Sequence, residues 1–343
     1  MQRESIATRL FGTDRAERDY RPNAAAIAVS HARLTPVQAA NTLQQIVDQV
    51  GSIILGKQIQ IRLTLACLLA RGHLLIEDIP GVGKTTLAHA LASSLGLKFQ
   101  RIQFTSDLLP ADIVGVSIFD RQTSAFNFHP GPVFAQMILA DEVNRATPKA
   151  QSALLEAMEE HQVTTEGQTR PLPEPFFVIA TQNPSYQVGT FPLPESQLDR
   201  FLMCLRLGYP DAQAERLLLE GRDRRDMVAE LTPHITAHEL IVLQQSTREV
   251  YASSALFDYL QALVTFTRQS PDFLTGLSPR SGLNLLNAAR AWAFLEGRDF
   301  VLPEDVQTVL PSVIGHRLQS AGGQRSRDAD EVARKLLAEV PLP

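Results

Sequence analysis

Short apolar runs recur along the N-terminal half of the chain, and each of them ends at glycine, proline or a polar residue. The runs are His73–Ile76, Phe99–Phe104, Met137–Ala140 and Phe176–Ala180. Runs of this length are typical of strands that are buried on both faces, as in a parallel sheet. Stretches with helical spacing separate them, so the pattern predicts an α/β fold in which strands and helices alternate.

The pattern changes after Tyr209-Pro210, where helical spacing dominates and no strand is predicted. We therefore expect an α/β domain over residues 35–209 and an all-helical domain over 210–343. Residues 1–34 carry six arginines and four acidic residues, and we predict a flexible tail or docking arm there. The predicted helices of the second domain are Ala212–Glu220, Ala237–Tyr251, Ala255–Arg268, Gly282–Glu296 and Pro303–Gly315.

Composition excludes several classes of protein. The longest clean apolar run, Leu63–Ala70, is far shorter than the ~20 residues that cross a bilayer. Two cysteines, Cys67 and Cys204, cannot build a disulfide framework, and the chain start lacks the apolar stretch of a signal peptide. We predict a cytoplasmic protein without membrane insertion. The net charge of −5 argues against a protein that coats duplex nucleic acid.

A glycine-rich loop follows the first apolar run and precedes an apolar helix predicted over Leu87–Leu95. A strand, a loop and a helix in this order direct backbone N–H groups and the positive end of a helix dipole at phosphate oxygens. Lys84 is predicted to reach the β- and γ-phosphates of a nucleotide, and Thr85 to ligate Mg²⁺. The predicted nucleotide-binding residues are Pro80, Gly81, Val82, Gly83, Lys84, Thr85 and Thr86.

One position of this loop departs from the pattern G-x-x-x-x-G-K-[ST]. Asp78 stands where the first glycine is expected. Because it lies at the entry to the loop, we expect it to alter the loop geometry without abolishing nucleotide binding.

Polar residues follow two of the later runs. Asp141 and Glu142 come directly after Met137–Ala140. Asp141 is predicted to hold the Mg²⁺ hydration shell and Glu142 to act as the general base on the attacking water. The alternative is that the pair caps the next helix. Asn183 follows Phe176–Ala180; it either orients the water and senses the γ-phosphate or belongs to an Asn-Pro turn.

Arg200 precedes a further apolar stretch, Phe201–Leu207. An arginine that reaches the γ-phosphate of a neighbouring subunit accelerates hydrolysis by roughly 10³–10⁵-fold. From spacing alone, a surface salt bridge explains Arg200 equally well.

Taken together, these motifs resemble those of the MoxR family of AAA+ ATPases. The similarity covers about residues 40–343 and leaves out the N-terminal tail. The most specific stretches are Gly131-Pro132-Val133-Phe134-Ala135 and the run from Ala140 to Ala146. The segments that carry the resemblance are Gly81–Thr85, Gly131–Ala135, Ile138–Ala146, Ala180–Pro184 and Pro194–Leu202.

The resemblance implies a role for each candidate residue. Lys84 and Thr85 would be the Walker A residues, and Asp141 and Glu142 the Walker B pair. Asn183 would be sensor 1. The resemblance also implies that Arg200 is an arginine finger supplied in trans, that Arg280 of Ser278-Pro279-Arg280 is a sensor 2 acting within the same subunit, and that Gly56 belongs to the adenine-side loop.

The same resemblance implies an AAA+ P-loop NTPase core with hairpin inserts at Val116–Phe128 and Gln162–Pro173, followed by a helical lid. It implies ATP and Mg²⁺ as cofactors and a homo-oligomeric ring, with six subunits expected. The activity would be ATP hydrolysis coupled to chaperone-like assembly or remodelling of a client protein complex. A separate protein with a von Willebrand factor A domain is the implied partner.

Two other hypotheses stay open. One is a nucleotide-gated binding module with little turnover. The departure of Asp78 from the phosphate-loop pattern is the reason to retain this hypothesis. The other is a DNA-linked AAA+ motor, which the acidic balance and the lack of a recognisable nucleic-acid-binding domain disfavour.

Overall fold

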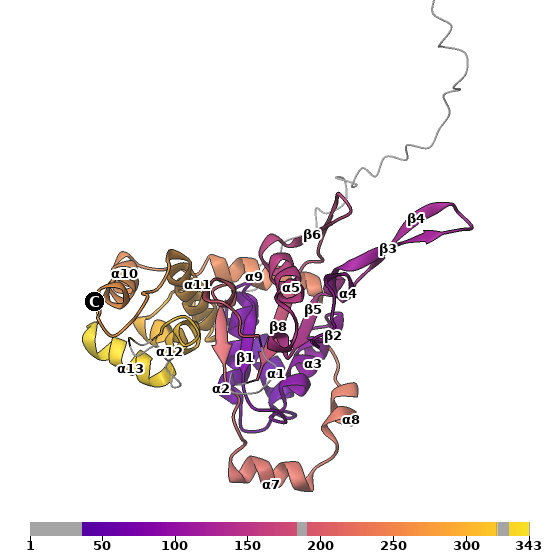
Figure 1. Cartoon of the computed structure of the whole chain (residues 1–343). Helices are drawn as coiled ribbons and strands as arrows, with labels where there is room; N and C mark the ends of the chain where they lie inside the picture. The colour runs from indigo at the N-terminus through magenta and orange to yellow at the C-terminus, as the bar shows by residue number, and fades with distance from the viewer. Residues whose placement is uncertain (1–35, 184–190, 320, 322–328, 343) are drawn as a thin grey trace, which may run out of the picture. The chain divides into compact units, whose positions relative to one another are not determined.

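A five-stranded parallel sheet lies at the centre of the computed structural model, which describes residues 36–183, 191–319, 321 and 329–342 (Figure 1). Its strand order is β2-β5-β8-β1-β9. The predicted parallel α/β core is confirmed, and the fifth strand forms within the apolar stretch that follows Arg200. The strands are β1 (Leu74–Glu77), β2 (Phe99–Gln103), β5 (Met137–Asp141), β8 (Phe177–Gln182) and β9 (Met203–Leu205).

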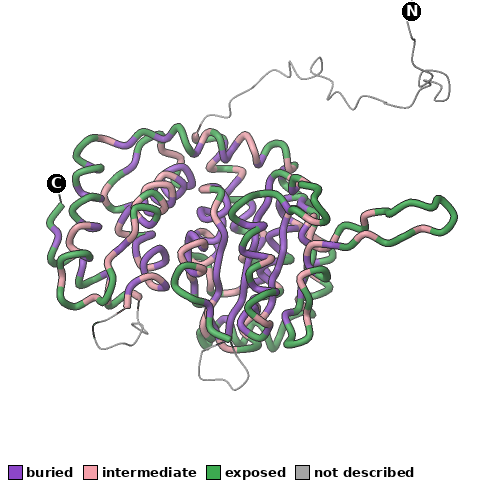
Figure 2. Tube along the Cα trace, turned by 45° about the horizontal axis from the view of Figure 1, so that its top comes forward, coloured by how far each residue is buried: buried purple, intermediate pink, exposed green. Residues whose placement is uncertain are grey.

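Alternate residues of the central strands enter two different apolar clusters. In β1, Leu74 and Ile76 pack on one side of the sheet, whereas Leu75 packs on the other. Strands β5 and β8 divide their residues in the same way. This is the two-residue period of a strand with both faces covered, and it explains why the runs are continuously apolar. Figure 2 shows the strands at the centre of the fold mostly as buried residues, in purple.

Helices cover both faces of the sheet. The cluster on one face includes residues of α1, α2 and α3, and the cluster on the other face includes residues of α5. Helix α1 shows the expected amphipathic spacing, with Leu43, Ile46, Val47 and Val50 buried. The helices of this part are α1 (Pro36–Gly51), α2 (Gln58–Leu69), α3 (Lys84–Ser94), α4 (Pro110–Val114), α5 (Pro148–Glu160) and α6 (Glu195–Leu198).

The described chain after Tyr209 forms helices joined by loops, and Tyr251 and Phe300 form an isolated bridge there. Residues of α9 to α13 share an apolar cluster with α1, α2 and α3, and residues 34–343 form one compact unit. The boundary at residue 209 stays a prediction, and the predicted tail lies outside the described residues. The helices are α7 (Ala212–Glu220), α8 (Arg224–Ala229), α9 (Ala237–Arg248), α10 (Ser254–Gln269), α11 (Pro279–Leu295), α12 (Pro303–Ile314) and α13 (Ala329–Glu339).

Both predicted hairpins form. Strands β3 (Gly115–Asp120) and β4 (Ala125–Pro130) make a long ribbon, and β6 (Gln162–Thr165) pairs with β7 (Gln168–Pro171). Figures 1 and 2 show the first ribbon projecting from the fold with mostly exposed residues. The two hairpins contact each other, because Ser117 hydrogen-bonds Glu166 and the Arg170 guanidinium lies 3.8 Å from the Phe128 ring centroid. Among the described residues, no helix is both long and apolar enough to cross a membrane.

A buried histidine lies beside β1. His73 Nδ1 accepts from the N–H of Val178, and Nε2 is 3.2 Å from the carbonyl oxygen of Met158. The ring is therefore a neutral tautomer with Nε2 protonated. Burial lowers the pKa of His73 from its ordinary 6.5 to about 4.

This histidine predicts a pH dependence of stability. As the pH falls from 6.5 towards 4, the unfolded chain binds a proton at His73 that the folded chain does not, so the free energy of unfolding decreases. The contribution of this group is at most ~1.4 kcal/mol per pH unit. In denaturant titrations over this range, His73→Asn should be less stable than the wild type at pH 7 and should show a shallower decrease. Equal slopes in the two proteins would contradict the assignment.

Candidate nucleotide-binding site

The predicted site residues meet at one edge of the sheet. Strands β5, β8 and β1 are neighbours and run parallel, so their carboxyl ends lie side by side. The phosphate loop follows β1, Asp141 ends β5, and Asn183 follows β8. These segments enclose a cavity of about 280 Å³. It is lined by Pro80, Gly81, Gly83, Lys84, Thr85, Thr86, Asp141, Glu142 and Asn183.

Two glycines shape the phosphate loop. Gly81 and Gly83 have φ of +86° and +92°, which is left-handed backbone that favours glycine. Helix α3 starts at Lys84, directly after the second glycine, so its free N–H groups open into the cavity. Val82 does not line the cavity but packs against the apolar core.

The ammonium group of Lys84 is buried near three carboxylates. Its Nζ donates to the backbone oxygen of Asp78 at 2.6 Å. Burial lowers the pKa of Lys84, whereas the charges of Asp78, Asp141 and Glu142 act in the opposite direction. A phosphate group that binds Lys84 must therefore compete with these carboxylates for its positive charge.

Asp78 has a structural role that the motif does not reveal. Its side chain is buried, and Oδ2 accepts from the N–H groups of Leu207 and Gly208 at 2.7 and 2.6 Å. Oδ1 accepts from the N–H of Ile79 at 2.8 Å. The carboxylate thus joins the entry of the phosphate loop to the segment after β9. The expected effect of Asp78 on the loop geometry stays a prediction.

The acidic pair has separate partners. Asp141 Oδ1 accepts from the hydroxyl of Thr181 at 2.6 Å, and Oδ2 accepts from Nη2 of Arg101 at 2.6 Å. The sequence analysis missed Arg101 and Thr181. Arg101 could have been found as a polar residue on β2, the strand adjacent to β5, and Thr181 as a hydroxyl near the end of β8.

Glu142 is held in an uncommon backbone conformation, with φ of 57°. One carboxylate oxygen accepts from Nδ2 of Asn183 at 3.0 Å, and the other lies 3.2 Å from Arg145. The amide of Asn183 is thus aimed at the predicted base, and Asn183 itself is buried. This contact decides against an Asn-Pro turn as the sole role of Asn183.

The donor atoms near Asp141 fit a magnesium ion. The carboxylate of Asp141 and the hydroxyl of Thr85 both border the cavity, and Mg²⁺ prefers such hard oxygen ligands with water completing its shell. The same carboxylate already faces one cation, the guanidinium of Arg101.

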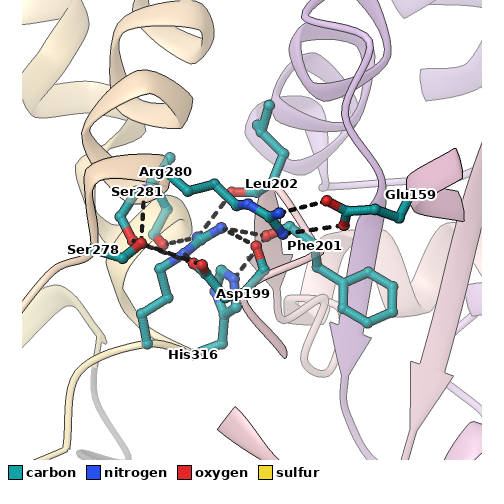
Figure 3. A network of polar contacts seen from close by, with 10 residues as sticks. Glu159, Asp199, Phe201, Leu202, Ser278, Arg280, Ser281 and His316 are labelled. Carbon is teal, nitrogen blue, oxygen red and sulfur yellow. Dashed lines mark hydrogen bonds and ion pairs between the residues drawn. The ribbon is translucent and has the colours of Figure 1, made fainter. Parts of the chain in front are cut away.

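Besides Val82, three other predicted residues do not line this cavity. Gly56 lies beside α7, where an added Cβ would be 3.2 Å from that of Ala214. Arg200 and Arg280 instead converge on Glu159, near the end of α5. Arg200 Nε is 3.8 Å from a Glu159 oxygen, and Arg280 contacts the same carboxylate through two nitrogens (Figure 3).

A buried ion pair lies beside these arginines. Arg317, whose side chain is 4% exposed, donates from Nε to Asp199 at 2.8 Å and from Nη1 to the carbonyl oxygen of Leu202 at 3.1 Å. Burial lowers the pKa of Arg317, and Asp199 opposes that effect. Asp199 also accepts from two hydroxyls at the start of α11, from Ser278 at Oδ2 and from Ser281 at Oδ1 (Figure 3).

Comparison with known proteins identifies the family of this chain. Residues 73–203 match the model of the ATPase family associated with various cellular activities (AAA), and residues 265–336 match the AAA lid domain. The chaperone MoxR1 of Mycobacterium tuberculosis is 41% identical over 81% of this chain and 76% of its own length. This chain belongs to the MoxR family of AAA+ ATPases.

Two further similar proteins cover more of the chain. The uncharacterized protein YeaC of Bacillus subtilis is 45% identical over 88% of this chain and 95% of its own length. A solved structure of a candidate ATPase from Cytophaga hutchinsonii is 36% identical, with a TM-score of 0.82, and the match covers 90% of this chain and 97% of that one. The AAA+ core and helical lid expected from the resemblance are therefore confirmed.

The hydrogen bonds from Leu207 and Gly208 to Asp78, which we call the Asp78 clamp, predict the effect of placing at this position the glycine of the general pattern G-x-x-x-x-G-K-[ST]. Asp78→Gly leaves the N–H groups of Leu207 and Gly208 without their acceptor, and each buried unsatisfied group costs ~1–3 kcal/mol. We expect a lower thermal unfolding temperature and weaker binding of a fluorescent ATP analogue. Asp78→Asn, which retains one acceptor oxygen, should lie between the two. A glycine variant that binds nucleotide more tightly at unchanged stability would exclude the clamp.

Proposed function

We propose that this MoxR-family protein hydrolyses ATP with Mg²⁺ in a homo-oligomeric ring, for which six subunits are expected. The observation that carries the proposal is the 3.0 Å contact between the amide of Asn183 and the carboxylate of Glu142, at the border of a cavity that also holds the phosphate loop. A phosphate sensor and a base in direct contact suit hydrolysis better than binding alone.

The chemistry follows from the residues around the cavity. The loop N–H groups and Lys84 bind phosphate oxygens, and Glu142 accepts the proton of the attacking water while Asn183 orients its carboxylate. Asp141 and Thr85 are the residues that would hold Mg²⁺, whose chemistry when bound is to neutralise charge on the phosphates. Because Arg101 contacts Asp141, it must share or release that carboxylate when the site fills.

The ring is proposed from the position of the two arginines. Arg200 and Arg280 are partly exposed and share Glu159 instead of lining their own cavity. The resemblance had implied that Arg280 acts within its own subunit. Its position beside Arg200 supports a different role, in which one subunit presents both arginines to the γ-phosphate bound by its neighbour.

The chaperone-like role rests on family membership and on the exposed hairpin. Phe119 and Phe126 are 49% and 72% exposed on the β3–β4 ribbon, where a client protein has access to them. We propose that nucleotide turnover drives assembly or remodelling of a client complex, together with a separate protein that contains a von Willebrand factor A domain.

Removing the proposed base separates hydrolysis from mere binding. We expect Glu142→Gln to bind ATP like the wild type but to release phosphate at least ~100-fold more slowly, because general-base catalysis contributes about that much. Steady-state phosphate release by the assembled protein is the measurement. Glu220→Gln, on the exposed face of α7, is the matched control. Equal rates for the wild type and Glu142→Gln would favour the nucleotide-gated module with little turnover.

Mixing of inactive variants tests the shared site. Arg200→Ala and Arg280→Ala should each bind ATP and lose hydrolysis, by about 10³-fold or more for an arginine finger. When either variant is mixed with Lys84→Ala, activity should partly return, because the Lys84→Ala subunit supplies both arginines to an intact phosphate loop.

The mixture with Arg280→Ala decides between the two roles of Arg280. If Arg280 acted within its own subunit, that mixture would stay inactive while the mixture with Arg200→Ala recovered. Mixed assembly is verified by co-purification of differently tagged subunits. Arg216→Ala, which removes an exposed arginine of α7, should retain full activity alone.

A further inference from the structure

A second polar cavity lies apart from the nucleotide-binding site. It has a volume of about 410 Å³ and shares no lining residue with the cavity around the phosphate loop. It forms where the ends of α2, α5 and α9 approach the middle of α11. Its lining consists of Ala70, Arg71, His161, Thr247, Arg248, Asn287 and Arg290.

Positive charge in this cavity is only partly balanced. Arg71 lies 3.6 Å from Glu174. Within the described residues, no ion pair is formed by Arg248 or Arg290. Nε of Arg290 is buried and has no hydrogen-bond partner in that part of the chain. A buried N–H of a charged group that has no hydrogen-bond partner destabilises the folded state. A ligand that supplies an acceptor atom would remove this penalty.

The two unpaired arginines also repel each other. Burial lowers the pKa of Arg290, and the charge of Arg248 lowers it further. A guanidinium nevertheless stays protonated in proteins. The folded chain therefore keeps two like charges together at this cavity, at a cost that a bound anion would remove.

We propose that this cavity binds a small polyvalent phosphate anion of the pyrophosphate class. Planar guanidinium groups form paired hydrogen bonds with phosphate oxygens, and Arg248 and Arg290 provide two of them. Asn287 adds an uncharged amide and His161 an imidazole, whereas the Thr247 hydroxyl already donates to the carbonyl oxygen of Leu243. The volume suits a small ligand, and the lining offers no ring larger than imidazole on which a base would stack.

The cavity lies between α5 and α11, the two helices that the pair of Glu159 and Arg280 joins. His161 directly follows α5, which carries Glu159, while Arg290 lies on α11, which carries Arg280. An anion between His161 and Arg290 would join the same two helices that the pair of Glu159 and Arg280 already joins. Binding at this cavity would therefore stabilise the position of Arg280. The anion site itself does not depend on the proposed ATPase activity.

Pyrophosphate is the probe that tests this site. Lys84→Ala in the full chain serves as the background, because it weakens phosphate binding at the phosphate loop. Isothermal titration of pyrophosphate into this protein should give one saturable site. Adding Arg248→Gln or Arg290→Gln should weaken binding at least tenfold, and Arg290→Lys should retain part of the affinity because it keeps the charge without the planar fork. Arg216→Gln, at an exposed arginine on α7, should leave binding unchanged.

Several outcomes overturn the proposal. They are the absence of saturable binding at low millimolar pyrophosphate, binding that survives both Arg248→Gln and Arg290→Gln, and equally tight binding of citrate, which would show that the site responds to charge alone. ADP binding that Arg248→Gln abolishes would support the proposal and identify nucleotide phosphates as a source of the anion. Circular dichroism checks folding, and if Arg290→Gln unfolds, Arg248→Gln decides alone because Arg248 is exposed.

Discussion

The buried guanidinium of Arg317 is the interaction on which the arrangement of the arginines depends. It joins the end of α12 to the segment from Asp199 to Leu202, and Asp199 in turn holds the first residues of α11. Arg200 follows Asp199 directly, and Arg280 lies between Ser278 and Ser281. One carboxylate therefore sets the spacing of two arginines that are 80 positions apart in sequence. Breaking a buried pair of this kind leaves an uncompensated charge and costs ~3–5 kcal/mol.

Much of the fold and the residues that line the cavity were predictable, because a residue that ends a parallel strand must lie at one edge of the sheet. A polar residue after a buried parallel strand must emerge at the carboxyl edge of the sheet. The phosphate loop, Asp141 with Glu142, and Asn183 all obey this rule, and they do border one cavity. Helix α13 was not predicted, although Ala333 and Leu336 keep helical spacing and are buried.

The rest was not predictable because it depends on contacts between distant segments. The clamp from Asp78 to Leu207 spans 129 positions, and the pair of Arg280 with Glu159 spans 121. Local pattern contains no information about such pairs. Asp78 departs from the sequence motif, and only its hydrogen bonds with the backbone N–H groups of Leu207 and Gly208 explain its role. Arg280 carried the right motif, but packing of α11 against the core placed it beside Arg200 instead of its own phosphate loop.

The ribbon formed by β3 and β4 has a consequence for the solution behaviour of a single subunit. In the described part of the chain, this two-stranded sheet has no third strand on either side, so each outer edge offers unpaired backbone groups next to exposed Phe119 and Phe126. Free edges with aromatic side chains are the features through which proteins self-associate. Asp120 and Arg121 place opposite charges near the tip, and Pro130 removes a donor at the base. We therefore expect the ribbon, which is the surface that we propose for client binding, also to favour self-association as the concentration of this protein rises.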